Sequence, residues 1–175
     1  MTLPTRIIAF ATIAVVTITA AVASGRTGPG SQPATPSLDR DSTLVGVWRT
    51  QVRPRDCVTG ELPPVPVRPG HGLFTFHEGG TASEYGIGPG QSPSLRSPGH
   101  GVWRRTHGWQ EYEYEFEFTR HDEDGAFVGS AKVTSALTMD ASGDSWTSNS
   151  QVEVFDAAGN LILAPCVTGS GIRFE

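Results

Sequence analysis

Residues 111–118 read EYEYEFEF, with a glutamate at every other position and an aromatic residue after each one. A β-strand produces such alternation because its successive side chains point to opposite faces of the sheet. The glutamates are therefore expected to face water. The alternate positions are expected to face a core: Tyr112, Tyr114, Phe116 and Phe118.

The same period-two alternation, interrupted by turn residues, recurs from residue 44 onward, and helical periodicity is scarce. It predicts eight strands: 44–53, 71–77, 82–87, 99–106, 109–120, 126–139, 145–156 and 161–174. Short connections rich in Gly, Asn and Asp predict consecutive hairpins. Since a meander removes its exposed edges by closing, the predicted fold class is all-β, an eight-stranded antiparallel up-and-down barrel.

The N-terminal part of the chain differs in composition from the rest. Residues 1–23 read as a signal peptide, because Arg6 precedes an apolar run that ends in small residues. Residues 24–43, rich in Gly, Pro and Ser, are expected to form a disordered linker, and residues 44–175 the barrel domain. We therefore expect a secreted or periplasmic protein without membrane contact in its mature form. Retention of the apolar run as a membrane anchor is the open alternative.

Charge and motif content exclude several classes of site. The formal net charge is −5, so no basic surface is expected to hold a nucleic-acid backbone. The five histidines form no H-x-x-x-H or H-E-x-x-H pattern, and neither G-x-S-x-G nor a phosphate-binding loop occurs. We therefore expect no metal and no cofactor. A single histidine ligand to zinc or haem is the lesser alternative.

The chain has two cysteines, which in an exported protein favour one disulfide. Cys57 follows the first predicted strand and Cys166 lies in the last. A bond between them would tie the beginning of the domain to its end, where closure of the barrel makes the two strands neighbours. A pair of free reactive thiols is the alternative.

Registers inferred from the turns place large residues beside small ones. A two-residue turn at 107–108 puts Trp103 opposite Tyr112, and pairing Tyr112 with Val133 continues the layer into the next strand. In the same registers Gly101 lies opposite Tyr114. The inward face is therefore expected to alternate rings with glycine or alanine.

The outward face of the same strands is expected to carry ion pairs. The only lysine, Lys132, falls between Glu113 and Glu153 in these registers. His100 falls opposite Glu115. A general base has to reach a substrate, so an outward His100 is better interpreted as a solvated partner of Glu115 than as a catalytic residue.

The inferred layers give the interior an aromatic middle and a polar end. Such a combination is typical of pockets that bury an apolar ligand and fix its polar group. The candidate ligand-binding residues are Trp103, Arg105, Gln110, Tyr112, Tyr114, Phe116, Ser135 and Ser150. The alternative is that the rings fill the middle completely while Arg105 and Gln110 lie in water at the barrel mouth.

One short motif carries a family resemblance. The stretch 44–48, LVGVW, is similar to the G-x-W signature of lipocalins and related calycin barrels, and avidin-like barrels carry a similar one. The resemblance implies that Trp48 closes one end of the barrel and that Arg173 lies across its ring, a favourable cation–π contact. The stretches SPGHGVW and VEVFDAAGN also resemble small exported bacterial lipocalin-like proteins.

These observations lead to one functional hypothesis and two rivals. The first is a secreted, non-enzymatic module that holds a small apolar or amphipathic molecule inside the barrel. The second follows from a resemblance to barrels of the allene oxide cyclase type, in which Tyr112 or Tyr114 would act as donor and Arg105 would hold a carboxylate. The third is a filled barrel that serves protein interaction. Ligand identity and oligomeric state are not predicted.

Overall fold

The computed structural model describes residues 43–92 and 95–174. The predicted signal peptide, and the predicted linker apart from Thr43, lie outside the described residues. No α-helix occurs in the described part of the chain, and thus none there that could cross a membrane. Its strands are β1 (Gly46–Arg55), β2 (Gly70–Phe76), β3 (Thr81–Ile87), β4 (Gly99–His107), β5 (Glu111–His121), β6 (Phe127–Met139), β7 (Ser145–Asp156), β8 (Leu161–Leu163) and β9 (Cys166–Arg173).

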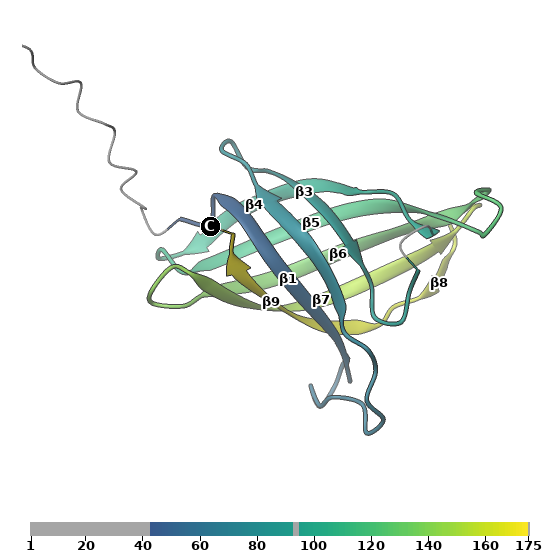
Figure 1. Ribbon diagram of the computed structural model, residues 1–175, viewed down its shortest axis with the longest axis horizontal. Coiled ribbons are helices and arrows are strands. Elements are labelled where there is room, and N and C mark those ends of the chain that lie inside the picture. Colours follow the sequence, from purple (N-terminus) through teal and green to yellow (C-terminus); the bar gives the residue numbers. More distant parts are fainter. Residues whose placement is uncertain (1–42, 93–94, 175) are drawn as a thin grey trace, which may run out of the picture. The chain divides into compact units, whose positions relative to one another are not determined.

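Eight of these strands form a closed antiparallel barrel (Figure 1). Strands β1 to β7 pair in chain order, β7 pairs with β9, and β9 pairs with β1. The short β8 pairs with the end of β7. This arrangement confirms the predicted eight-stranded up-and-down barrel.

The last predicted strand is divided into β8 and β9 at Ala164 and Pro165. Proline has no backbone N–H and cannot donate to the sheet, so a strand is interrupted there. The Pro165 carbonyl still accepts a hydrogen bond of 2.9 Å from the Val152 backbone N–H. The barrel is therefore continued by β9, while β8 remains at its margin.

The register between β4 and β5 differs from the prediction by two residues. Trp103 lies opposite Tyr114, not Tyr112. The turn comprises residues 108–110, and a bulge lies between Arg105 and His107. The prediction of a two-residue turn at 107–108 was therefore wrong. A shift of two preserves the side of the sheet on which each side chain lies, which is why the inward set is still correct.

The register between β5 and β6 differs by four residues, whereas that between β6 and β7 is as predicted. Tyr112 lies opposite Leu137 rather than Val133. Met139 lies opposite Trp146, as the compact turn at 140–144 indicated. The even shift again leaves the inward face unchanged.

The outward face carries the ion pairs expected from alternation, with corrected partners. Lys132 lies between Glu117 and Glu153 in the sheet, and its Nζ is 2.9 Å from a carboxylate oxygen of Glu115. His100 is exposed and lies opposite Glu117, not Glu115. The outward position of His100 is thus confirmed, and its partner is corrected.

Trp48 closes one end of the barrel, as the lipocalin resemblance implied. Its side chain is fully buried, and its Nε1 donates a 2.9 Å hydrogen bond to the Leu44 carbonyl. The Arg173 guanidinium lies 4.3 Å from the ring centroid and donates to the carbonyls of Thr43, Val45 and Gly143. We call this the Trp48 end. At the opposite end, the loop end, segment 56–69 leaves the barrel, and residues 88–92 and 95–98 belong to the connection from β3 to β4.

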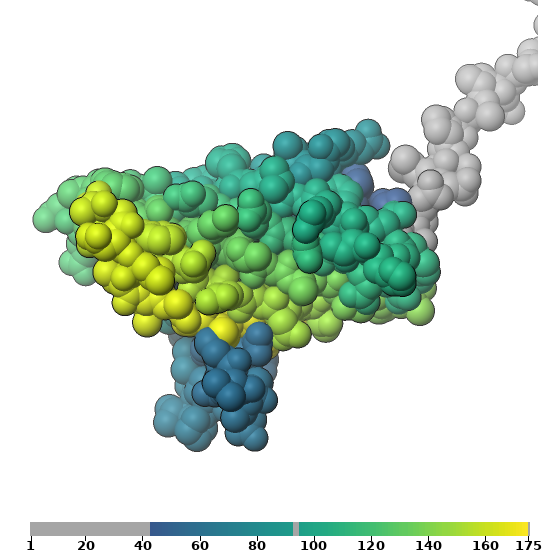
Figure 2. Space-filling model, turned by 180° about the vertical axis from the view of Figure 1, so that it is seen from behind, coloured from purple at the N-terminus to yellow at the C-terminus, as the bar shows by residue number. Residues whose placement is uncertain are grey.

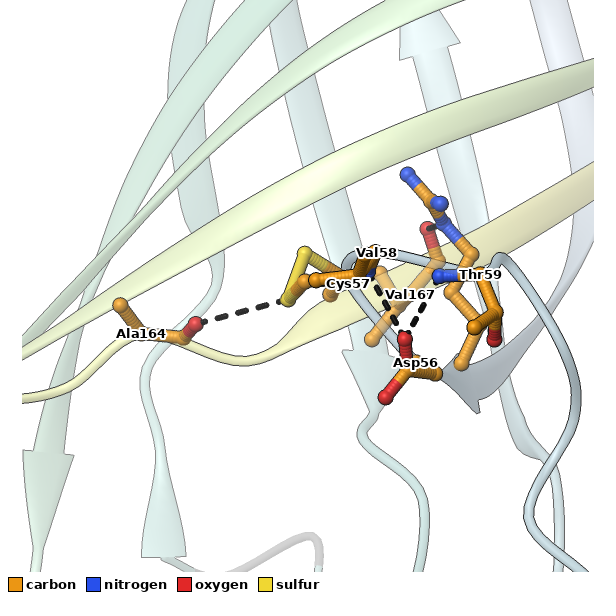
Figure 3. Close-up of a disulfide and its surroundings, with 8 residues drawn as sticks. Asp56, Cys57, Val58, Thr59, Ala164 and Val167 are labelled. Atoms are coloured by element: carbon orange, nitrogen blue, oxygen red, sulfur yellow. Dashed lines mark hydrogen bonds between the residues drawn. A yellow bond between two sulfur atoms is a disulfide. The ribbon is translucent and has the colours of Figure 1, made fainter.

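A disulfide joins Cys57 to Cys166, with the two Cα atoms 5.1 Å apart (Figure 3). It links the segment after β1 to the first residue of β9, beside the last pair of these strands, Arg55 and Cys166. The predicted bond is confirmed. It fixes the closure of the barrel at the loop end.

Candidate functional site

Five of the predicted ligand-binding residues are buried inside the barrel, a sixth, Trp103, packs against its core, and two lie at the rim. The side chains of the first five are buried: Tyr112, Tyr114, Phe116, Ser135 and Ser150. Trp103 is half-buried, and its Nε1 donates 3.0 Å to the His77 carbonyl at the Trp48 end. Arg105 is exposed at the same rim, and Gln110 donates 2.9 Å to the Met139 carbonyl.

The aromatic middle of the barrel is packed by its own rings. Phe74 lies 4.4 Å from Phe76 and 5.0 Å from Tyr114, centroid to centroid. Phe76 in turn lies 6.0 Å from Trp103 and 6.5 Å from Trp146. Phe74 and Phe76 are stacked and the other pairs are tilted or edge-on, which are favourable aromatic geometries. The Trp48 half of the barrel is therefore a packed core.

The polar groups of the middle bond to one another. The hydroxyls of Ser135 and Ser150 are 2.7 Å apart, and that of Tyr114 lies 3.3 Å from Ser148 Oγ. The predicted polar end, in which these serines would join Arg105 and Gln110, is not formed. Arg105 instead donates a 3.3 Å hydrogen bond to the Tyr112 hydroxyl. In the observed registers Arg105 pairs with Tyr112 and Tyr112 with Leu137, so the serines lie two residue pairs further from the rim.

A charged pair that the sequence analysis missed lies inside the loop end. Glu84 on β3 is only 9 % exposed and is paired with Arg96, which precedes β4. The Arg96 guanidinium also stacks 3.5 Å above the Phe118 ring. Glu84 and Gly99 form the last pair between β3 and β4, so Arg96 fills the position where these strands separate.

Arg96 is held there by the strand next to it. Its backbone bridges to Arg120, and the Ser97 N–H donates 3.0 Å to the Thr119 carbonyl. The Ser97 hydroxyl accepts from the Thr119 N–H at 3.0 Å. These bonds extend β5 pairing beyond β4 and point the guanidinium toward Glu84.

Burial shifts the pKa of both members of this ion pair. Burial raises the pKa of the Glu84 carboxyl above its ordinary value, against the opposing charge of Arg96. Burial also lowers the pKa of the Arg96 guanidinium, against the opposing charge of Glu84. Desolvation disfavours each charged form, and the ion pair offsets part of that cost.

Opposite this pair, the loop end is lined by small apolar residues. We call Val52, Val152, Val154 and Val167 the valine wall; they lie on β1, β7 and β9 and continue the inward-facing alternation of those strands. Val167 is buried, but Val52, Val152 and Val154 are only half-buried although they face inward. The neighbouring inward positions Gly72 and Gly169 add no side chain. Phe116 and Phe118 on β5 share the layers of Val152 and Val154, which pack against the core. The rings at this end are therefore carried by β5, and the inward side chains of β1, β7 and β9 are small.

A separate depression of about 510 Å³ lies on the outside of the barrel over β4, β5 and β6. Its lining includes the exposed Arg104–Glu113 ion pair and Thr134. Within the described residues no group of three or more His, Cys, Asp or Glu side chains could hold a metal ion.

No protein-family model, no curated protein and no solved structure matches this chain. The closed eight-stranded barrel is compatible with a lipocalin-like fold, and membership of the lipocalin or calycin group remains a prediction from the motif at 44–48.

Proposed function

We propose that this protein is a non-enzymatic binding module that holds a small, mainly apolar molecule in the loop end of its barrel. The observation that carries the proposal is the contrast between the two halves of the interior. The Trp48 half is filled by rings, whereas three of the four residues of the valine wall face inward and are only half-buried. Apolar walls with a few polar groups are the usual composition of a ligand pocket.

The Glu84–Arg96 pair supplies the polar part of this site. The two charges neutralise each other, so the site presents hydrogen-bonding atoms without net charge. A ligand carrying a hydroxyl, carbonyl or amide group can bond to the pair without introducing an unpaired charge, which burial would penalise. The proposed ligand is therefore a neutral amphipathic molecule whose apolar part contacts the valine wall.

Two matched variants test the location of the site. Val152→Trp places a large ring at the inward wall, whereas Gln151→Trp places the same ring on the outward face of the same strand. We expect the first to abolish the fluorescence enhancement of Nile red, a neutral apolar dye, by the folded protein and the second to preserve it. Equal enhancement by both variants would locate the dye elsewhere and contradict the proposal.

A carrier and a cyclase-type enzyme differ in their response at Tyr112. This phenol is 1 % exposed, and its hydroxyl accepts a hydrogen bond from Arg105. In a carrier, Tyr112→Phe should change ligand affinity only modestly. Loss of product formation from a reactive lipid, with ligand binding preserved, would instead establish the enzyme.

A further inference from the structure

Strand β8 presents an unpaired edge. It is the terminal strand of the sheet order and pairs only with β7, through Val154 with Leu163 and Phe155 with Leu161. Its other edge faces the position that β1 would occupy if it continued past Arg55, whose partner is Cys166. An extended segment could therefore be added there as a further strand.

The chain turns away from that position at Asp56. The Asp56 carboxylate accepts hydrogen bonds from the backbone N–H groups of Val58 at 2.8 Å and Thr59 at 2.7 Å (Figure 3). The backbone N–H of Gly60 then donates to the Asp56 carbonyl. Segment 56–69 consequently leaves the sheet and projects from the barrel, while the C-terminal strands remain on the surface (Figure 2).

The free edge is apolar on all three residues. Leu161, Ile162 and Leu163 are 54 %, 57 % and 59 % exposed. No charged residue and no proline occurs within 161–163, although these are the usual means of protecting an edge strand. An exposed apolar edge of this kind is a template for pairing with a strand of another chain.

We propose that β8 pairs with β8 of a second copy of this chain. A two-fold axis at Ile162 would run the two strands antiparallel and place Leu161 of each copy opposite Leu163 of the other. The triplet is thus complementary to itself in both side chains and backbone, and it carries no charge to repel its copy. Three residues form a short contact compared with stable interfaces of roughly 1,200–2,000 Å². The dimer is therefore weak and depends on concentration.

Sedimentation velocity over about 1 µM to about 1 mM tests this pairing. We expect the wild-type protein to shift from monomer to dimer and Ile162→Lys to weaken association at least about tenfold. The control is Ile172→Lys, because Ile172 is 64 % exposed on β9, a strand paired on both edges. It should associate like the wild type.

Far-ultraviolet circular dichroism and thermal unfolding of each variant establish that it is folded. In the wild type, concentration-dependent amide shifts should centre on residues 161–163. A wild-type protein that stays monomeric throughout the range overturns the proposal, even if it binds a foreign apolar peptide at β8. Equal loss of association in both lysine variants overturns it as well.

Discussion

The buried pair of Glu84 and Arg96 gives the sharpest prediction from the fold. In Arg96→Met the side chain keeps much of its apolar volume over Phe118 but leaves the Glu84 carboxylate without its counter-ion. The two side chains are only 8 % and 10 % exposed, so the pair is shielded from solvent. Removing one partner of a buried pair costs about 3–5 kcal/mol, and we expect that loss of unfolding free energy near neutral pH.

The loss should shrink as the pH falls. The pKa of Glu84 in the folded protein lies above its ordinary value of 4.5 because burial disfavours the carboxylate. A group whose folded-state pKa is raised binds its proton more tightly in the folded state, so stability increases as pH falls through that pKa and the gain is complete below 4.5. Without Arg96 the folded-state pKa of Glu84 rises further. The unfolding free energy of the variant therefore increases more on acidification than that of the wild type.

Urea unfolding followed by tryptophan fluorescence at about pH 7 and about pH 5 measures both effects. Comparing each variant with the wild type at the same pH cancels the contributions of other carboxylates, such as Asp140. Arg104→Met is the control, because Arg104 pairs with Glu113 on the exposed face; we expect little change at either pH. Equal losses in the two variants, or a loss in Arg96→Met that does not depend on pH, would refute the reasoning.

Three further stability predictions follow from the fold. Cys57→Ser opens a disulfide with a sequence separation of 109 and should lower the unfolding free energy by about 5 kcal/mol on the chain-entropy account, as measured by urea unfolding; an unchanged midpoint would contradict it. Gly99→Val should destabilise by about 1–3 kcal/mol in the same assay because an added Cβ would lie 2.6 Å from the Phe116 ring, and Gly79→Ala, which meets nothing within 4 Å but has a positive φ, is a control for backbone strain alone. Trp48→Ala should cost about 3–5 kcal/mol in thermal unfolding, and a loss no larger than that of an exposed aromatic such as Tyr85→Ala would argue against its role in closing the barrel.

Alternation was sufficient to predict the barrel and its inward face. The residues 111–118 alternate so strictly that only the phase of the strand had to be chosen, and burial of a ring is far more favourable than burial of a glutamate. The register between β6 and β7 was also predictable, because the Asp140 turn is compact and its carboxylate accepts two backbone hydrogen bonds, from Gly143 and Ser145. Shifts by two or four residues were not detectable, since they leave every side chain on the same face.

The candidate site was predicted less well, and Glu84 shows why. Strand β3 contains both Glu84 and Tyr85, and hydrophobicity alone would place the tyrosine inward. The structure exposes Tyr85 and buries Glu84, because Arg96 arrives from a Pro- and Ser-rich segment to neutralise it. A counter-ion supplied by an irregular segment leaves no periodic signal. The small inward neighbours Ala82 and Gly86 were the only local indication that a charged side chain had room there.

Native mass spectrometry of the protein purified from its own host tests the binding proposal most directly. We predict a species heavier than the polypeptide by the mass of one small molecule, which is released on denaturation and is absent from Val152→Trp but present in Gln151→Trp. A wild-type spectrum containing only the mass of the polypeptide, or a bound molecule retained equally by both variants, would contradict a ligand site at the valine wall.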